Sequence, residues 1–286
     1  RAKFYAIVHK NEAKPKLSTE KVEFAKLNVY EKALTVIKND SAIPVKDVSG
    51  RNLIINIGGE GTAFNKAASF YTNADTLSAK TAKDAWAIYK FVFRNYDNIY
   101  LNLIAPSVLP RNNFSYPEGW KDLLREMPEE SKVYVSIFGN PYAVDDAYAF
   151  EKVQAVILAF QNTESGQNRA AQLIFGGFQA NSVLPITLSA DYQEGFGITT
   201  PKASRLKFTV PMELGVKASS FNQIDSIVNN GMKEKAFPGC QVVVAKDGKV
   251  VYQKSFGHHT YDNKIAVDDK TIYDIASITK VAASTA

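Results

Sequence analysis

The sequence has little cysteine, no long apolar run, and only scattered glycine and proline. Its single cysteine, Cys240, excludes an internal disulfide framework and a zinc site built from several thiolates. No apolar run approaches the ~18 residues that a membrane-spanning helix needs, so we expect no membrane span. The 16 glycines and 11 prolines form no regular array, which excludes collagen-like and proline-rich chains.

The net charge is also low, at +5 over 286 residues. Basic residues of the first fifty positions supply most of this excess, but they alternate with acidic residues along a helical pattern. We interpret them as a solvated helix face and expect no nucleic-acid partner, because nucleic-acid binding requires a concentrated basic patch. Hydrophobic residues make up 45% of the chain, which excludes extensive disorder. No motif indicates a metal or an organic cofactor.

Apolar runs alternate with helical periodicities over residues 41–190. Buried strands are predicted at 51–59, 98–106, 132–141, 152–160 and 183–189, and helices at 19–39, 81–96, 117–127 and 164–178. Because each strand is apolar on both faces, we predict an α/β fold, namely a flavodoxin-like open, mostly parallel sheet sandwiched by helices. The glycines of 58–61 lack a complete phosphate-binding motif, so we interpret this segment as a tight turn.

The pattern changes after residue 190. Residues 191–216 are rich in glycine, proline and threonine, and we interpret them as a linker. Residues 217–286 are predicted to be a fragment of a second domain, with a helix at 219–235, a β-hairpin at 241–257 and a helix that begins near Ser277. Asp247-Gly248 is typical of a two-residue hairpin turn. The last helix stops in mid-pattern and the chain does not begin with methionine, so we expect a processed protein or an excised fragment.

Ser277 and Lys280 form an S-x-x-K element at the start of that last helix. A serine and a lysine three residues apart share one helix face, where the lysine can activate the hydroxyl as a nucleophile. The alternative interpretation is a helix-capping serine beside a surface lysine. Two further matches, Ser18–Lys21 and Ser204–Lys207, are interpreted as chance. The sequence contains no Lys-Thr-Gly or His-x-Gly element, so the other parts of a Ser/Lys/Tyr catalytic site are missing from it.

Two stretches of the first part of the chain resemble a known family. They are ALTVIKNDSAIPVKD (33–47) and AAQLIFGGFQANSVLPITLS (170–189), and GFG at 195–197 extends the likeness. Together they resemble the C-terminal α/β sandwich domain of glycoside hydrolase family 3, over residues ~20–200, the size of an ordinary domain. The segment Asn181-Ser182-Val183 departs from the pattern, because the family usually has glycine and a basic residue there.

Residues 237–285 resemble the start of a serine hydrolase related to class C beta-lactamases and penicillin-binding proteins. The phrase FPGCQVVVAKDGKVVYQKSFG, followed by YDIASITK, carries this likeness. The resemblance implies that Ser277 is the nucleophile and Lys280 its basic partner. It also implies that the remaining catalytic elements lie beyond Ala286.

The tandem resembles bacterial proteins in which a family 3 beta-N-acetylhexosaminidase-like enzyme is fused to a beta-lactamase-like domain. In such proteins a catalytic (β/α)8 barrel of ~250 residues precedes the sandwich, and this chain has no room for one. Residues 1–40 are then connecting helices at the tail of that barrel, and no glycosidase catalytic residue is assigned to this chain. The resemblance implies a periplasmic or cell-surface glycosidase of carbohydrate or peptidoglycan metabolism, of which this chain alone is inactive.

Two alternatives remain open from the sequence. The sandwich could be a non-catalytic domain for binding or assembly, with Ile275, Ile278 and Val281 docking on it or on another copy. The chain could instead be an esterase, peptidase or beta-lactamase-like enzyme that acts through Ser277, with a partner chain supplying the missing half. The sequence does not determine the oligomeric state.

Overall fold

The computed structural model describes residues 18–89, 92–107, 109, 113–145 and 147–285. The chain divides into two units, unit 1 ending at Phe208 and unit 2 beginning at Thr209. Each unit is described by itself. No helix of the described residues has the length and apolar character required to cross a membrane.

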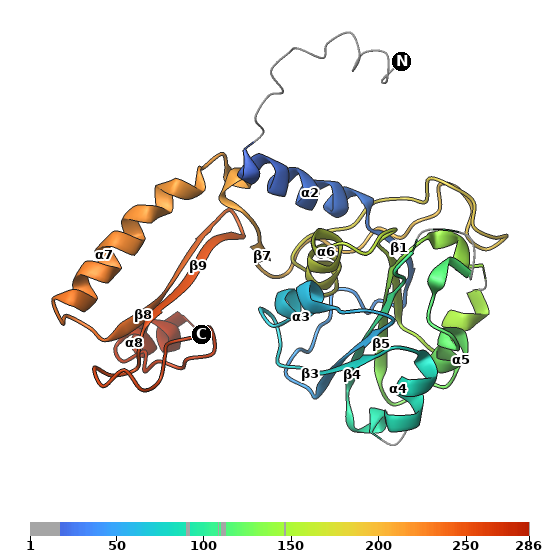
Figure 1. Ribbon diagram of the computed structural model, residues 1–286, viewed down its shortest axis with the longest axis horizontal. Helices are drawn as coiled ribbons and strands as arrows, with labels where there is room; N and C mark the ends of the chain where they lie inside the picture. The colour runs from blue at the N-terminus through green and yellow to red at the C-terminus, as the bar shows by residue number, and fades with distance from the viewer. Residues whose placement is uncertain (1–17, 90–91, 108, 110–112, 146, 286) are drawn as a thin grey trace, which may run out of the picture. The chain divides into compact units, whose positions relative to one another are not determined.

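Unit 1 is built on a six-stranded sheet with the order β1-β6-β5-β4-β2-β3 (Figure 1). Its strands are β1 (Thr35–Asn39), β2 (Asn52–Ile57), β3 (Asp75–Ala79), β4 (Asn98–Ile104), β5 (Lys132–Phe138) and β6 (Ala155–Leu158). Strands β2 to β6 are parallel, whereas β1 pairs antiparallel with β6. Taken alone, the parallel strands have the flavodoxin-like order 2-1-3-4-5. The predicted fold class is therefore confirmed.

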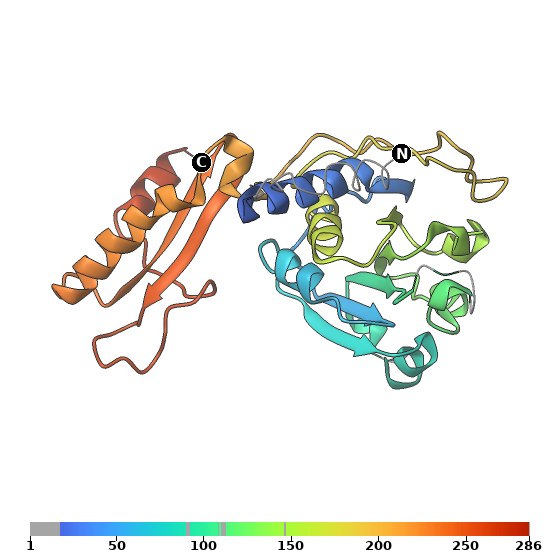
Figure 2. The ribbon, with the colours of Figure 1, turned by 45° about the horizontal axis from the view of Figure 1, so that its top comes forward.

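Helices cover both faces of this sheet (Figure 1 and Figure 2). They are α2 (Thr19–Ala33), α3 (Thr62–Ala68), α4 (Ala82–Tyr89), α5 (Trp120–Arg125) and α6 (Glu164–Ile174), with 3-10 turns at Phe93–Asn95, Asn113–Ser115, Pro141–Ala143 and Ala147–Phe150. Alternate residues of each strand enter two separate apolar clusters. Ile55 of β2 packs in one cluster with Trp120 of α5, and Ile54 packs in the other with Phe64 of α3. The strands are therefore apolar on both faces, as the sequence predicted.

Four of the five predicted strands are confirmed as β2, β4, β5 and β6, but two element predictions are wrong. The helix expected at 19–39 ends at Ala33, and its last residues form β1. The β-branched residues Val36 and Ile37 are fully buried in that strand, where pairing with β6 outweighs the helical periodicity. The strand expected at 183–189 is a hydrogen-bonded loop, in which Leu184 exchanges backbone hydrogen bonds with Gly195 and Phe196. The sequence also missed α3 and β3.

Four buried asparagines link β2 to β4 in two register-matched pairs. Asn98 Nδ2 donates to Asn52 Oδ1 at 3.0 Å, and Asn102 Nδ2 donates to Asn56 Oδ1 at 2.8 Å. Asn56 Nδ2 in turn donates to Asn65 of α3 at 3.3 Å. A slip of one residue would separate both pairs and leave buried amides without partners, which is costly in an apolar interior. The pairs therefore specify the register of β2 against β4.

Unit 2 is a helix and a hairpin followed by an extended segment. Its elements are 3-10 turns at Pro211–Leu214 and Ala218–Phe221, α7 (Asn222–Lys233), β8 (Gly239–Lys246), β9 (Lys249–Gly257) and α8 (Ile278–Thr285), while the two-residue strand β7 (Lys207–Phe208) ends unit 1. Asp247 and Gly248 both have positive φ, at 52° and 73°, as a two-residue hairpin turn requires. The predicted hairpin is thus confirmed.

Replacing one member of an asparagine pair should destabilise unit 1 more than replacing both. Asn56→Leu and Asn102→Leu should each lower the free energy of unfolding by about 1–3 kcal/mol, because each leaves a buried amide unpaired. The double variant should cost clearly less than the sum of the two, because both partners are then apolar. Urea unfolding followed by tryptophan fluorescence measures this in unit 1, which holds both tryptophans, Trp86 and Trp120. Strictly additive losses would contradict the pairing.

Candidate functional site

The structure brings the two predicted catalytic residues together at the start of α8. Lys280 Nζ donates a hydrogen bond to Ser277 Oγ at 3.2 Å, and the Lys280 amide donates to the Ser277 carbonyl at 3.1 Å. Both residues are exposed. Ser277 directly precedes the first residue of the helix, Ile278. The N-terminal end of a helix carries partial positive charge from its aligned peptide dipoles, so this position favours an anion that forms next to the serine.

Ser277 and Lys280 have the spacing of a nucleophile and a base. The pair lacks the shielding from water that an active pair of this kind requires. A lysine can accept the serine proton only in its neutral form, which desolvation favours. The neighbouring apolar side chains Ile272, Ile275, Ile278 and Val281 are 95%, 49%, 65% and 64% exposed. The site as described is therefore exposed to solvent. Activation of Ser277 by Lys280 requires that this apolar surface be covered.

The backbone before Ser277 makes a sharp turn. Ala276 has a positive φ of 43°, and its amide donates to Asp274 Oδ1 at 2.7 Å. The Ile278 amide then donates to the Ile275 carbonyl at 2.9 Å, which closes the turn that leads into α8. Asp274 and Ala276 were not predicted from the sequence. No residue type in YDIAS indicates that the alanine adopts a left-handed backbone conformation.

A polar cluster holds α7 against the hairpin of unit 2. The carboxylate of Asp225 accepts hydrogen bonds from Lys254 Nζ at 2.6 Å and from the Tyr252 hydroxyl, and the Tyr252 ring stacks on Phe221 at 5.2 Å. The bonds from Lys254 and then Tyr252 hold the pKa of Asp225 below its ordinary value. Desolvation, followed by the bond to Asp225, raises the pKa of Tyr252 to about 12.

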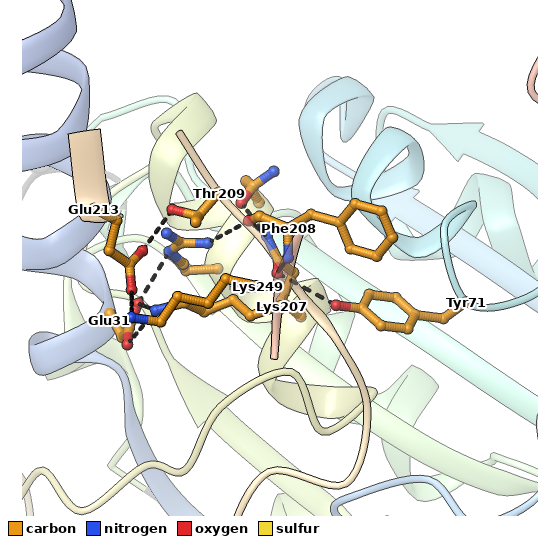
Figure 3. A network of polar contacts seen from close by, with 10 residues as sticks. Glu31, Tyr71, Lys207, Phe208, Thr209, Glu213 and Lys249 are labelled. Atoms are coloured by element: carbon orange, nitrogen blue, oxygen red, sulfur yellow. Dashed lines mark hydrogen bonds and ion pairs between the residues drawn. The ribbon is translucent and has the colours of Figure 1, made fainter. Parts of the chain in front are cut away.

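The two other S-x-x-K matches have structural roles. Ser18 Oγ accepts a hydrogen bond from the Lys21 amide at 3.3 Å and caps α2. Lys207 Nζ donates to both carboxylate oxygens of Glu31, each at 2.9 Å, and Arg169 Nε lies 3.5 Å from the same carboxylate (Figure 3). Within unit 2, Figure 3 shows Glu213 joined to Thr209 and Lys249, at 2.6 Å and 2.9 Å. Ion pairing, rather than catalysis, accounts for Lys207.

The glycine segment after β2 is a closed turn. Gly58 has φ of 89°, and a Cβ at Gly58 or Gly61 would collide with the Ile104 carbonyl or with Asn56 Oδ1. Gln167 of α6 also donates from Nε2 to the Glu60 carbonyl at 3.0 Å. The glycine backbone is thus packed closely against its neighbours, as the interpretation as a tight turn at a strand end expects. Among the described residues, no three His, Cys, Asp or Glu side chains form a metal-binding cluster.

Unit 2 should lose stability in acid through Asp225. Because the pKa of Asp225 is lowered in the folded state, its contribution is present above the ordinary aspartate pKa of ~3.9 and is lost as the pH falls through the folded-state value. We expect the urea midpoint of the β8–β9 amide signals in NMR spectra to fall below about pH 4. In Asp225→Asn this acid-dependent step should shrink, whereas in the exposed Asp269→Asn it should persist. An unchanged step in Asp225→Asn would contradict the assignment.

Comparison with known sequences identifies a family for the end of the chain. Residues 224–286 match the model of the Beta-lactamase family. Protein flp of Staphylococcus aureus (strain NCTC 8325 / PS 47) is 36% identical over 61 residues, or 21% of this chain. The matched segment spans only 12% of the length of that relative.

Solved structures resemble the chain in fold. A GH3 beta-glucosidase from Bifidobacterium adolescentis superposes with a TM-score of 0.53 at 13% identity, covering 69% of this chain and 39% of that chain. Beta-D-glucoside glucohydrolase from Trichoderma reesei gives 0.50 at 14% identity, covering 67% of this chain and 38% of that chain. At such identities the likeness shows the fold and leaves the activity open. The two resemblances predicted from the sequence are confirmed: the chain joins an α/β sandwich with the fold of glycoside hydrolase family 3 structures to a segment that matches the Beta-lactamase family.

Proposed function

We propose that this chain is part of a multidomain hydrolase in which Ser277 is the nucleophile of a serine hydrolase domain. The observation that carries the proposal is the 3.2 Å hydrogen bond between Lys280 Nζ and Ser277 Oγ, inside the segment that matches the Beta-lactamase family. The pair lies at the start of a helix, where the backbone favours an oxyanion. Beta-lactams and related acyl compounds are the substrate class that this arrangement suits.

In the proposed reaction Ser277 Oγ attacks an acyl carbon while its proton passes to the neutral amine of Lys280. The new bond joins Oγ to the acyl carbon, and the bond from that carbon to the leaving group breaks. Lys280 returns the proton to the leaving group, and water later hydrolyses the acyl-serine ester to regenerate the hydroxyl. The first step needs Lys280 neutral to accept the serine proton, so the exposed pair described above would react only after the apolar surface around it is covered.

For unit 1 we propose a supporting role beside a glycosidase domain that this chain does not contain. The fold likeness to a beta-glucosidase supports a carbohydrate substrate for the parent protein. Within that class we propose β-linked amino sugars or related glycosides. Glycoside hydrolysis needs two carboxyl groups placed about 5–10 Å apart across the scissile bond. We assign no pair of carboxyl groups in the sandwich to this reaction. The catalytic carboxylates would therefore come from outside it. A periplasmic or cell-surface location is part of the same proposal.

Ser277 should react covalently with serine-directed probes in the native protein purified from its source. A fluorophosphonate probe or a fluorescent penicillin should label it, and peptide mass spectrometry should place the label on the peptide that contains Ser277. Ser277→Ala should abolish labelling and Lys280→Met should lower its rate by about 100-fold or more, within the range that a general base contributes.

A matched control tests whether the label reports the site. Ser284 lies on the same helix, is also exposed, and donates to the Val281 carbonyl at 3.1 Å. Ser284→Ala should leave labelling unchanged. Full labelling of Ser277→Ala, or no labelling of the native protein, would overturn the proposal.

The 286-residue chain by itself should show neither activity. It should not hydrolyse an aryl N-acetylglucosaminide. Ser277 should also stay unlabelled, because Lys280 is exposed to solvent and is not shielded from water. Release of the aryl group is followed by absorbance, with the native protein as the positive control. Turnover by the 286-residue chain would show that unit 1 holds catalytic groups and would refute its supporting role.

A further inference from the structure

The residue before Ser277 has a backbone conformation that alanine adopts only under constraint. Ala276 has φ of 43°, in the left-handed region where the Cβ of an L-residue approaches its own carbonyl oxygen. Glycine, asparagine and aspartate are the residues that usually occupy this region. Such a conformation persists only where surrounding contacts impose it, and such residues concentrate at functional sites.

The contact that imposes it here is a carboxylate two residues upstream. Asp274 Oδ1 accepts a hydrogen bond from the Ala276 amide at 2.7 Å, the short length typical of an ionised acceptor. An aspartate side chain that binds the amide two residues onward competes with helical hydrogen bonding of the backbone. Asp274 therefore keeps the chain non-helical as far as Ala276.

This non-helical turn determines where α8 begins. The Thr279 amide donates to the Ala276 carbonyl at 3.1 Å and the Lys280 amide to the Ser277 carbonyl at 3.1 Å, so the first helical bonds start beside the serine. If Ala276 adopted a right-handed helical conformation, the helix could extend backwards and Ser277 would lie inside it. The serine would then lose its place at the positive end of the helix dipole.

We propose that Asp274 is a positioning residue for Ser277. Its carboxylate holds Ala276 left-handed, which places Ser277 at the helix start with Oγ 3.2 Å from Lys280 Nζ. Asp274 touches neither the hydroxyl nor the ammonium group in the described structure and takes no part in proton transfer. The role of Asp274 in acylation rests on the proposed function of Ser277, whereas its effect on the backbone does not.

The first test measures the backbone, in the isotope-labelled 286-residue chain. A strong NOE between the amide proton and Hα of Ala276 in NMR spectra marks a positive φ. We expect this NOE in the wild-type chain and in Asp274→Asn, whose amide oxygen can still accept the bond, and expect its loss in Asp274→Ala. Persistence of the NOE in Asp274→Ala would overturn the proposal. Because Asp274 is exposed, the signals of the remaining residues report whether the variant is folded.

The second test measures phosphonylation of Ser277 in the native protein by a fluorophosphonate, in which an Oγ–P bond forms and fluoride leaves. Asp274→Ala should slow labelling of Ser277 by about tenfold or more, because a small misplacement of a reacting atom is costly in rate. Asp274→Asn should restore the rate to within about threefold, as expected of a residue that acts by position and not by charge. Asp269→Ala, which removes another exposed aspartate of the same segment, is the matched control and should react at the wild-type rate.

The outcomes separate the two proposals. An unlabelled wild-type protein refutes the nucleophile and with it any role of Asp274 in acylation, while the NOE still decides whether Asp274 shapes the turn. A labelled wild type with an equally fast Asp274→Ala refutes the positioning role alone. Slow labelling of both Asp274→Ala and Asp274→Asn refutes it as well, because the hydrogen bond would then not be the cause.

Discussion

The pairing of β2 with β4 is the constraint on which the sandwich depends. These two strands lie at the point where the strand order reverses, so that the chain builds outward from them in both directions. Apolar contacts alone would tolerate more than one register, since Ile and Leu, which supply most of the apolar side chains of both strands, are nearly interchangeable in packing. The amide pairs Asn52–Asn98 and Asn56–Asn102 remove this freedom, because only one register forms both inter-strand hydrogen bonds. Asn65 then extends the same network to α3.

The sequence predicted the central strands well because they are buried on both faces. Long apolar runs such as NLIINI and NIYLNLI have no competing interpretation once helices alternate with them. The errors fall at the margins of the sheet. Residues of β1 continue a helical periodicity, and only tertiary pairing with β6 makes them a strand. The edge strand β3 has one buried residue, Leu77, and therefore carries almost no apolar signal.

The candidate site was likewise predicted only in part from the sequence. Ser277 and Lys280 could be identified because chemistry dictates their types and helix geometry dictates their spacing. Asp274 could not, since its function lies in a backbone bond to Ala276 and any small acceptor would serve. The solvent exposure of the site could not be predicted from the sequence either, because it depends on which surfaces are covered in the folded structure. A motif can thus identify the reacting residues without indicating which residues position them or exclude water from them.

The row of exposed isoleucines around the site has a consequence for the handling of the protein. Ile272 and Ile278 hold apolar area in water, and two such surfaces gain free energy by meeting, at about 25 cal/mol for each Å² that they bury. In unit 1 most large apolar residues are enclosed in two clusters, although Val29, Tyr148 and Val183 are also exposed. We expect the exposed apolar residues of unit 2 to promote self-association as the protein concentration rises.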